Sequence, residues 1–322
     1  MATLFPNAPF TASPTELVII ACKSDDPTVL AQVLSRAPQQ PDLLHSRQRL
    51  LDRGLEYCVE RNAPRVLAYL IQQGADVTKV SPFDLARHEE YWRPPLELIA
   101  LLIAHGWDIN TRGPTGTDRP LLWYIMQYDH LVAWCLDRGA SVTVPEAPLV
   151  DHVNGTQRRA PRPLPAITEM AAAFGIVSTF ELLREKGAPL GKRTLHRAVE
   201  QAAALAPIQG AEPSIPYTHR MRMIRYLVDV EKLDVNAVEC VPGSKCSTPL
   251  CYPAMRATGQ DVRELTRFLL GRGADPILVR GVQGEAKLPS AIECAEEAGC
   301  ESFLEGVMEH MAADVEALRR RR

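Results

Sequence analysis

Apolar residues recur along this chain at the three- and four-residue spacing of an α-helix, in short runs that each end at a turn. In the first clear run, Val66, Leu67, Tyr69 and Leu70 fall on one face of a helix, and Gly74 follows. Such a face is buried when the helix packs against another element. Glycine takes the left-handed conformation that ends a helix without a Cβ penalty. The pattern predicts an all-α chain of short helices that end at such turns.

The same helix-and-turn segment occurs six times. Its copies are LAYLIQQGADV (67–77), IALLIAHGWDI (99–109), VAWCLDRGASV (132–142), FELLREKGAPL (180–190), IRYLVDVEKLDV (224–235) and RFLLGRGADPI (267–277). With Gly74, Gly106, Gly139, Gly187, Lys232 and Gly273 taken as equivalent, the spacings are 32, 33, 48, 45 and 41 residues. Two spacings match a repeat of about 33 residues, and the other three correspond to that unit with insertions.

Four segments also resemble one another where the next helix should begin. They are Thr248-Pro249-Leu250, Ser81-Pro82-Phe83, Thr194-Leu195-His196 and Ser290-Ala291-Ile292. We expect the leading hydroxyl residue to cap the helix, and proline suits a first helical turn. Turns and openings together resemble the ankyrin-repeat family, whose first helix opens with a Thr-Pro-Leu-His-x-Ala-like motif. The resemblance covers about residues 14–311 as roughly eight degenerate repeats. It implies a solenoid of stacked helix pairs with short hairpin fingers.

Departures from the repeat divide the chain further. We expect an N-terminal extension at residues 1–13, the repeat domain at 14–311 and a basic C-terminal helix end at 312–322. Insertions are expected in fingers at 145–165 and 240–247 and between paired helices at 204–218, with a shorter extension at 88–95. Solenoid insertions fall on loops, often on the binding face, because the stacked core cannot absorb them. They are interpreted either as tolerated loop growth or as parts of a binding surface.

The net charge of the chain argues against two classes of binding partner, nucleic acids and membranes. The 322 residues carry 36 Lys plus Arg and 39 Asp plus Glu, a formal charge of −3. Broad nucleic-acid or membrane binding needs a net basic surface, so neither is predicted. The opening MATLFPNAPFTAS lacks the parts of a secretory signal, and Leu98–Ala104 is too short to span a bilayer. We expect an intracellular, cytoplasmic protein. Arg319–Arg322 is expected to be a solvated helix end, with a nuclear-import patch as the alternative.

The eight cysteines are too dilute for a disulfide scaffold. Four of them, Cys22, Cys58, Cys135 and Cys294, lie in apolar stretches and are expected to be buried, reduced thiols. The best metal-site candidate is the set Cys240, Cys246 and Cys251, but it lacks the close CxxC pairs of structural zinc sites. We predict a reduced, metal-free cluster there. A zinc site and a disulfide between the loop cysteines are the alternatives.

No motif for catalysis or for a cofactor is present. HExxH, a nucleophile elbow, GxGxxG and a phosphate-binding loop are all missing, so no cofactor is predicted. His196 stands at the motif position where ankyrin repeats place a histidine that hydrogen-bonds their turns, which implies a structural role. Four carboxylates near helix openings, Glu56, Asp84, Glu169 and Glu293, are general acid–base candidates. Solvation, or hydrogen bonding to backbone amides at helix starts, is the simpler role for them.

Aromatic residues are concentrated in one part of the chain, because all four tryptophans fall within residues 92–134. Trp123 and Trp134 have helical spacing and are expected in the core. Trp107 replaces the small residue of a turn, and the nearby 145–165 insertion carries arginines. Aromatic and arginine side chains dominate many binding surfaces. We therefore predict a binding site outside the core, made of Trp92, Trp107, Asn110, Arg112, Arg158 and Arg159. Local core packing of the aromatics is the alternative.

Two classes of function remain open. The resemblance to ankyrin repeats implies a non-catalytic module that recognises a protein partner through the concave surface of its fingers and first helices. The alternative is a cofactor-independent enzyme or small-molecule-binding protein, of the acid–base isomerisation or cyclisation type, with a pocket in that groove. An open polar groove would favour the first class, and a closed apolar pocket with convergent polar groups would favour the second.

Overall fold

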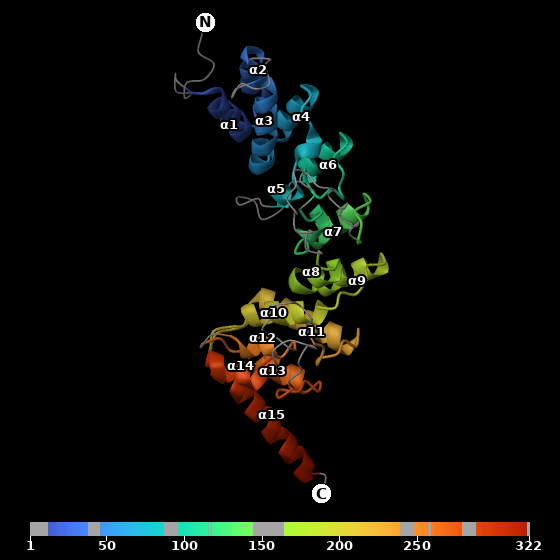
Figure 1. The fold of residues 1–322 in the computed structure, drawn as a ribbon, viewed down its shortest axis with the longest axis vertical. Coiled ribbons are helices and arrows are strands. Elements are labelled where there is room, and N and C mark those ends of the chain that lie inside the picture. The colour runs from blue at the N-terminus through green and yellow to red at the C-terminus, as the bar shows by residue number, and fades with distance from the viewer. Residues whose placement is uncertain are drawn as a thin grey trace, which may run out of the picture. The chain divides into compact units, whose positions relative to one another are not determined.

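The computed structural model describes residues 12–37, 46–86, 96–114, 116, 118–143, 164–238, 248–256, 259–278 and 288–320. These residues form fifteen α-helices and two short 3₁₀ helices, and among them no strand is found (Figure 1). The predicted all-α class is confirmed. The chain divides into two compact units, Met1–Leu164 and Pro165–Arg322, which are described separately. No helix of the described part is long and apolar enough to cross a membrane.

The first unit contains helices in two layers. The α-helices are α1 (Pro14–Ser24), α2 (Pro27–Arg36), α3 (Arg47–Arg61), α4 (Pro64–Gln72), α5 (Pro82–Ala86), α6 (Leu96–Ala104) and α7 (Asp129–Leu136), and the 3₁₀ helices are η1 (Val77–Lys79) and η2 (Leu121–Trp123). Contacts run from α1 to α3, α5 and η2 in one layer, and from α2 to α4 and α6 in the other. Contacts of α1 with α2 and of α3 with α4 join the layers. Helices therefore pack against elements that are near in sequence.

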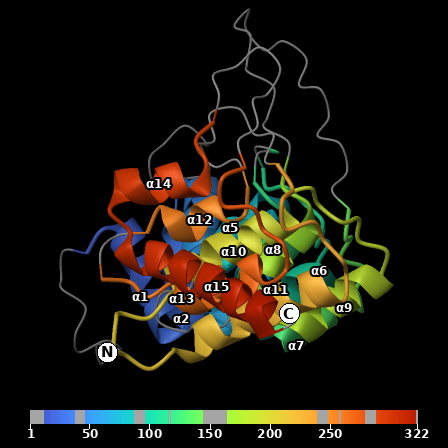
Figure 2. The same cartoon turned by 90° about the horizontal axis from the view of Figure 1, so that it is seen from below.

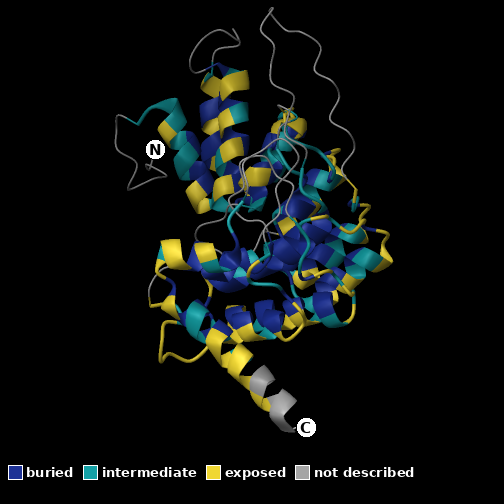
Figure 3. Cartoon of the chain, turned by 60° about the horizontal axis from the view of Figure 1, so that its bottom comes forward, coloured by how far each residue is buried: buried dark blue, intermediate teal, exposed yellow. Residues whose placement is uncertain are grey.

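The second unit has the same kind of layering. Its helices are α8 (Ile167–Phe174), α9 (Val177–Glu185), α10 (Thr194–Ala204), α11 (Ile215–Asp229), α12 (Cys251–Ala254), α13 (Arg263–Leu270), α14 (Ala291–Ala298) and α15 (Glu301–Arg320). Helices α8, α10, α12 and α14 form one layer, and contacts join α9 to α11 and α13 to α15 in the other (Figure 2). Helix α8 is buried along its whole length except Phe174, which places it within the core (Figure 3).

The six turns predicted from the sequence all have left-handed backbone. The φ angle is 88° at Gly74, 93° at Gly106, 85° at Gly139, 87° at Gly187, 58° at Lys232 and 88° at Gly273. After each of the five glycines, the next residue donates its backbone N–H to the carbonyl five residues earlier, as Ala75 does to Leu70 at 3.0 Å and Ala188 to Leu183 at 2.9 Å. This is the hydrogen bond of a Schellman turn, and it satisfies a carbonyl that the helix leaves unpaired.

Lys232 offers a direct test of this turn geometry, because it is the one position of the six that is not glycine. A side chain with a Cβ pays roughly 1 kcal/mol or more in the left-handed region. Lys232→Gly is therefore expected to raise the free energy of unfolding by about 0.5–1 kcal/mol. Gly187→Ala should lower it by about 1 kcal/mol, since no atom lies within 4 Å of the added Cβ and the cost falls on the backbone alone. Urea unfolding followed by circular dichroism measures both changes. Free energies of unfolding in the two variants that equal that of the unmodified chain would contradict the turn geometry.

A glycine inside a helix explains how closely α3 and α4 pack. A Cβ at Gly54 of α3 would lie 2.9 Å from both methyl carbons of Leu70. Leu70 itself is fully buried, as are Val66 and Leu67 on the same face of α4. The face predicted from the spacing of apolar residues is therefore the face that packs on the neighbouring helix.

A buried guanidinium connects two helices of the second unit. Arg220 of α11 is 4% exposed and donates one hydrogen bond to the carbonyl of Ala172 at 3.1 Å and another to the carbonyl of Gly175. These carbonyls lie at the C-terminal end of α8, where a cation is favourable. Burial lowers the pKa of Arg220 to about 10. The side chain therefore remains protonated at neutral pH and caps α8 from α11.

Helix starts and links differ from the expectations in three places. Ser290 caps α14 and Ser81 accepts the N–H of Phe83, as predicted, but Thr194 lies inside the first turn of α10 and donates to the carbonyl of Gly191. The link between α10 and α11 is shorter than the predicted insertion at 204–218, because α10 continues to Ala204 and α11 begins at Ile215. Thr248 was expected to cap its helix, but α12 begins at Cys251 with Leu250 as its N-cap.

Candidate functional site

Trp107 was expected outside the core, and that expectation is wrong. The side chain is 2% exposed, and its indole Nε1 donates to the carbonyl of Val80 at 3.0 Å. Val80 follows the 3₁₀ helix η1, so the indole occupies space beside the turn of the preceding segment. A small residue is usual at this place in the other turns, where Ala140, Ala188 and Ala274 are buried. Trp107 is therefore a packing residue of the first unit.

Asn110 links its own turn to the next one. Its Nδ2 donates to the carbonyl of Gly139 at 3.0 Å, and its Oδ1 accepts the N–H of Ser141 at 2.7 Å. Asn236 of the second unit repeats the arrangement, with Nδ2 donating to Gly273 at 2.8 Å and Oδ1 accepting from Asp275 at 2.8 Å. One asparagine side chain thus satisfies both a carbonyl and an amide of the following turn.

The paired bonds predict a cost for removing either asparagine. Asn110→Ala and Asn236→Ala each break two hydrogen bonds to backbone, and each net bond contributes about 0.5–1.5 kcal/mol. We expect each variant to lose about 1–2 kcal/mol of unfolding free energy, measured by urea titration. Asn110→Asp is the matched control, because it keeps the acceptor for Ser141 but loses the donor for Gly139, and its loss should be intermediate. No loss in either alanine variant would contradict a structural role for these links.

The other predicted binding residues are placed only in part. Arg112 is half-buried and its Nε donates to the carbonyl of Asp118 at 3.0 Å, within its own loop. Trp92, Arg158 and Arg159 lie outside the described residues. Asn110 and Arg112 thus remain near the surface, although both hold backbone groups.

The carboxylates near helix openings bind backbone amides or lie in solvent. Glu169 is 6% exposed and accepts the N–H of Arg193 at 3.0 Å, and Glu293 accepts the N–H of Ser290 at 2.7 Å in a capping box. Glu56 is exposed and pairs with Arg53 at 2.9 Å, and Asp84 is exposed. The simpler prediction for this group, helix capping or solvation, is therefore confirmed at these residues.

The described cysteines lie in the core, as does one of the described histidines. His196 is fully buried in α10. The four cysteines predicted to be buried are buried, and the sulfur atoms of Cys22 and Cys58 lie 3.5 Å apart across α1 and α3. Burial raises the pKa of Cys58 well above its usual value. Cys240 and Cys246 lie outside the described residues. Within the described ranges, no group of three or more metal-ligating side chains is found.

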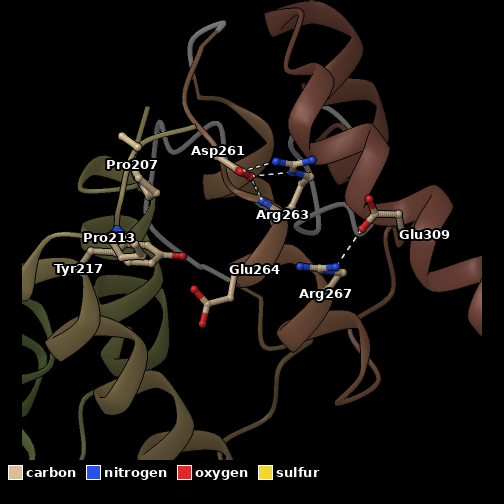
Figure 4. A pocket seen from close by; sticks show the side chains of 9 residues that line it. Pro207, Pro213, Tyr217, Asp261, Arg263, Glu264, Arg267 and Glu309 are labelled. Carbon is tan, nitrogen blue, oxygen red and sulfur yellow. Dashed lines mark hydrogen bonds and ion pairs between the residues drawn. The ribbon is translucent and has the colours of Figure 1, made fainter. Parts of the chain in front are cut away.

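A polar pocket that the sequence did not predict lies in the second unit. Its volume is about 330 Å³. It lies between the link from α10 to α11 and the helices α13 and α15 (Figure 4). The lining side chains are Pro207, Ala211, Pro213, Tyr217, Asp261, Arg263, Glu264, Arg267 and Glu309.

Backbone pairing holds the link that forms one wall of this pocket. Gln209 donates its N–H to the carbonyl of Gly259 at 2.9 Å, and Asp261 donates its N–H to the carbonyl of Pro207 at 2.7 Å. Ser214 then caps α11, where its hydroxyl accepts the N–H of Tyr217 at 3.2 Å. The tyrosine is therefore fixed in the first turn of α11, facing the segment that leads into α13.

All five charged side chains of the pocket form ion pairs. Arg263 contacts Asp261 with two nitrogens, at 2.9 and 2.5 Å, and Arg267 contacts Glu309 at 3.0 Å. Glu264 pairs at 2.8 Å with Arg225, which is not among the lining residues. Hydrogen bonds from Arg263 lower the pKa of Asp261, so this carboxylate is ionised at neutral pH. Three carboxylates against two guanidinium groups give the lining a formal charge of −1.

Tyr217 is the exception among these polar groups. Its side chain is 1% exposed, and its hydroxyl makes no hydrogen bond of standard geometry to a described residue. Figure 4 shows the hydroxyl directed toward Glu264. Burial, together with the nearby carboxylates of Glu264 and Asp261, raises the pKa of Tyr217. The phenol is therefore neutral at physiological pH and has hydrogen-bonding capacity left.

The sequence contained one signal for this pocket, the insertion at 204–218 with its prolines. It did not reveal which later segments would face the insertion. A comparison with protein-family models finds no matching family, and a comparison with curated proteins finds no significant match.

Proposed function

We propose that this chain is a stack of ankyrin-like helix pairs that acts as a non-catalytic binding module for a protein partner. The observation that carries the proposal is the asparagine link, which Asn110 and Asn236 make to the following turn with the same pair of atoms. A link of this kind holds successive turns at a regular spacing. Regularly spaced turns supply the extended surface that helical-repeat proteins use for binding.

The order of the helices along the chain supports eight helix pairs. In the first unit they are α1 with α2, α3 with α4, α5 with α6, and η2 with α7; in the second they are α8 with α9, α10 with α11, α12 with α13, and α14 with α15. The first members contact one another in sequence within each unit. A partner would therefore meet a row of first helices and the turns beside them.

In the second unit the described turn after α9 offers a surface for such a partner. Leu190 is 38% exposed, Lys192 is exposed, and Arg193 is half-buried beside Tyr252, whose hydroxyl accepts from its Nη2 at 3.3 Å. Arginine and tyrosine are enriched at protein interfaces, where a few residues carry most of the binding energy.

Affinity capture from native cell extract tests the proposal, with the full chain immobilised and both proteins and retained metabolites analysed. Leu190→Ser combined with Lys192→Glu should lower capture of the partner protein at least about tenfold, or roughly 1.4 kcal/mol. Val230→Ser combined with Arg222→Glu is the matched control, because it makes the same kinds of change at an exposed position of α11 and at its exposed C-cap. Equal capture by both double variants would contradict binding at the turns. Retention of a metabolite without a protein would favour the small-molecule alternative.

A further inference from the structure

The link between α10 and α11 exposes apolar side chains beside the polar pocket. Ile208 is 70% exposed and Ile215 is 73% exposed. Each lies within two residues of a proline that lines the pocket, Pro207 in one case and Pro213 in the other. The antiparallel bridge between Ile208 and Gln260 fixes the link in place. A rigid apolar rim therefore borders a charged pocket, and both parts belong to one unit.

We propose that this pocket binds the cationic group of an arginine or lysine side chain, carried by an extended segment of a partner protein whose apolar neighbours lie on Ile208 and Ile215. The buried hydroxyl of Tyr217 faces the pocket without a hydrogen bond of standard geometry to a described residue. A buried polar group of this kind gains free energy when a ligand supplies its partner.

The charges favour a cation over an anion. Asp261, Glu264 and Glu309 all line the pocket, and each is already paired with a guanidinium: Asp261 with Arg263, Glu309 with Arg267, and Glu264 with Arg225, which lies outside the lining. An anion would have to displace one of these carboxylates. The Arg225–Glu264 pair is exposed and therefore weak, so a second guanidinium or ammonium group can share the Glu264 carboxylate. The same group can donate to the phenol oxygen of Tyr217, while the phenol donates its own proton to Glu264.

This site is separate from the turns in which the proposed function places its partner, because every lining residue comes from α11, α13, α15 or the segments that precede α11 and α13. The two proposals can therefore fail independently. The turn variants leave the pocket unchanged, and the pocket variants leave the turns unchanged.

Fluorescence anisotropy with the full chain tests the pocket. The probe is the fluorescein-labelled peptide Gly-Ile-Pro-Arg-Ile-Pro-Gly, and the matched peptides replace arginine by citrulline or by glutamate. We expect the arginine peptide to bind at least about tenfold tighter than the citrulline peptide, since citrulline keeps the shape without the charge. Glu264→Gln and Tyr217→Phe should each weaken binding of the arginine peptide about tenfold, and the glutamate peptide should not bind.

Glu297→Gln is the control variant, because it makes the same substitution at an exposed position of α14 away from the pocket lining. Its affinity for the arginine peptide should match that of the unmodified chain. Circular dichroism melts show whether the variants remain folded. No saturable binding of the arginine peptide up to about 1 mM, equal binding of the citrulline peptide, stronger binding of the glutamate peptide, or unchanged affinity in Glu264→Gln and Tyr217→Phe would each overturn the proposal.

Discussion

Leu70→Asp is expected to lower the free energy of unfolding by about 4 kcal/mol or more, and so to unfold much of the first unit. Leu70 is fully buried, and both of its methyl groups lie where α4 approaches Gly54 of α3. Truncating a buried leucine alone costs about 2–5 kcal/mol, and an unpaired carboxylate in the same place adds the cost of desolvation.

Tryptophan fluorescence is the measurement for this variant, because all four tryptophans belong to the first unit. Urea unfolding followed by fluorescence should show the loss, while circular dichroism also reports on the second unit. Gln72→Asp is the control, since it places the same carboxylate at an exposed position of α4. An unfolding midpoint of Leu70→Asp equal to that of the control would show that this face of α4 is not buried.

Trp107→Ala is expected to cost about 3–5 kcal/mol, the range for removing a large buried aromatic side chain. The indole is 2% exposed and its Nε1 donates to the carbonyl of Val80, which would lose that partner. Trp107→Phe separates the two contributions in part, because it keeps an aromatic ring in the site but removes the pyrrole ring that carries the N–H donor. Its expected loss is about 1–3 kcal/mol.

Urea unfolding followed by circular dichroism measures both Trp107 variants without relying on the fluorescence that the substitution removes. A free energy of unfolding in Trp107→Ala that equals the unmodified value would mean that the indole lies at the surface. That outcome would restore Trp107 as a binding residue, as its sequence context first indicated.

The turns were predictable because their signal is local. A left-handed residue after a helix needs glycine or tolerates few alternatives, so five glycines and Lys232 marked the positions that the structure gives positive φ. The buried face of α4 was predictable for a similar reason, since helical spacing alone places Val66, Leu67 and Leu70 together.

Trp107 could not be placed from its own segment. Its position in a turn indicated exposure, but its environment depends on the space beside Val80, 27 residues earlier. Local sequence determines the path of the backbone at a turn. It does not determine which neighbouring element a large side chain packs against. Thr194 shows the same limit on a smaller scale, because a helix that begins one residue earlier turns an expected cap into a donor.

The polar pocket could not be predicted from the sequence for a related reason. Tyr217, Asp261 and Glu309 are far apart in the chain and meet only because α11, α13 and α15 pack in one unit. Nothing in the local sequence around any of these residues indicates a site. Only their convergence, with a buried hydroxyl among charged groups, distinguishes the site.

Hydrogen exchange of the full chain, alone and with the protein recovered by affinity capture, tests binding along the turns most directly. The proposed function predicts that the partner slows exchange in the turns at residues 107–112, 188–193 and 234–238 and in the adjoining first helices α8 and α10. Exchange in the outer helices α4 and α9 should stay unchanged. Protection confined to the outer helices, with the turns exchanging as in the free chain, would contradict a binding surface built from the repeated turns.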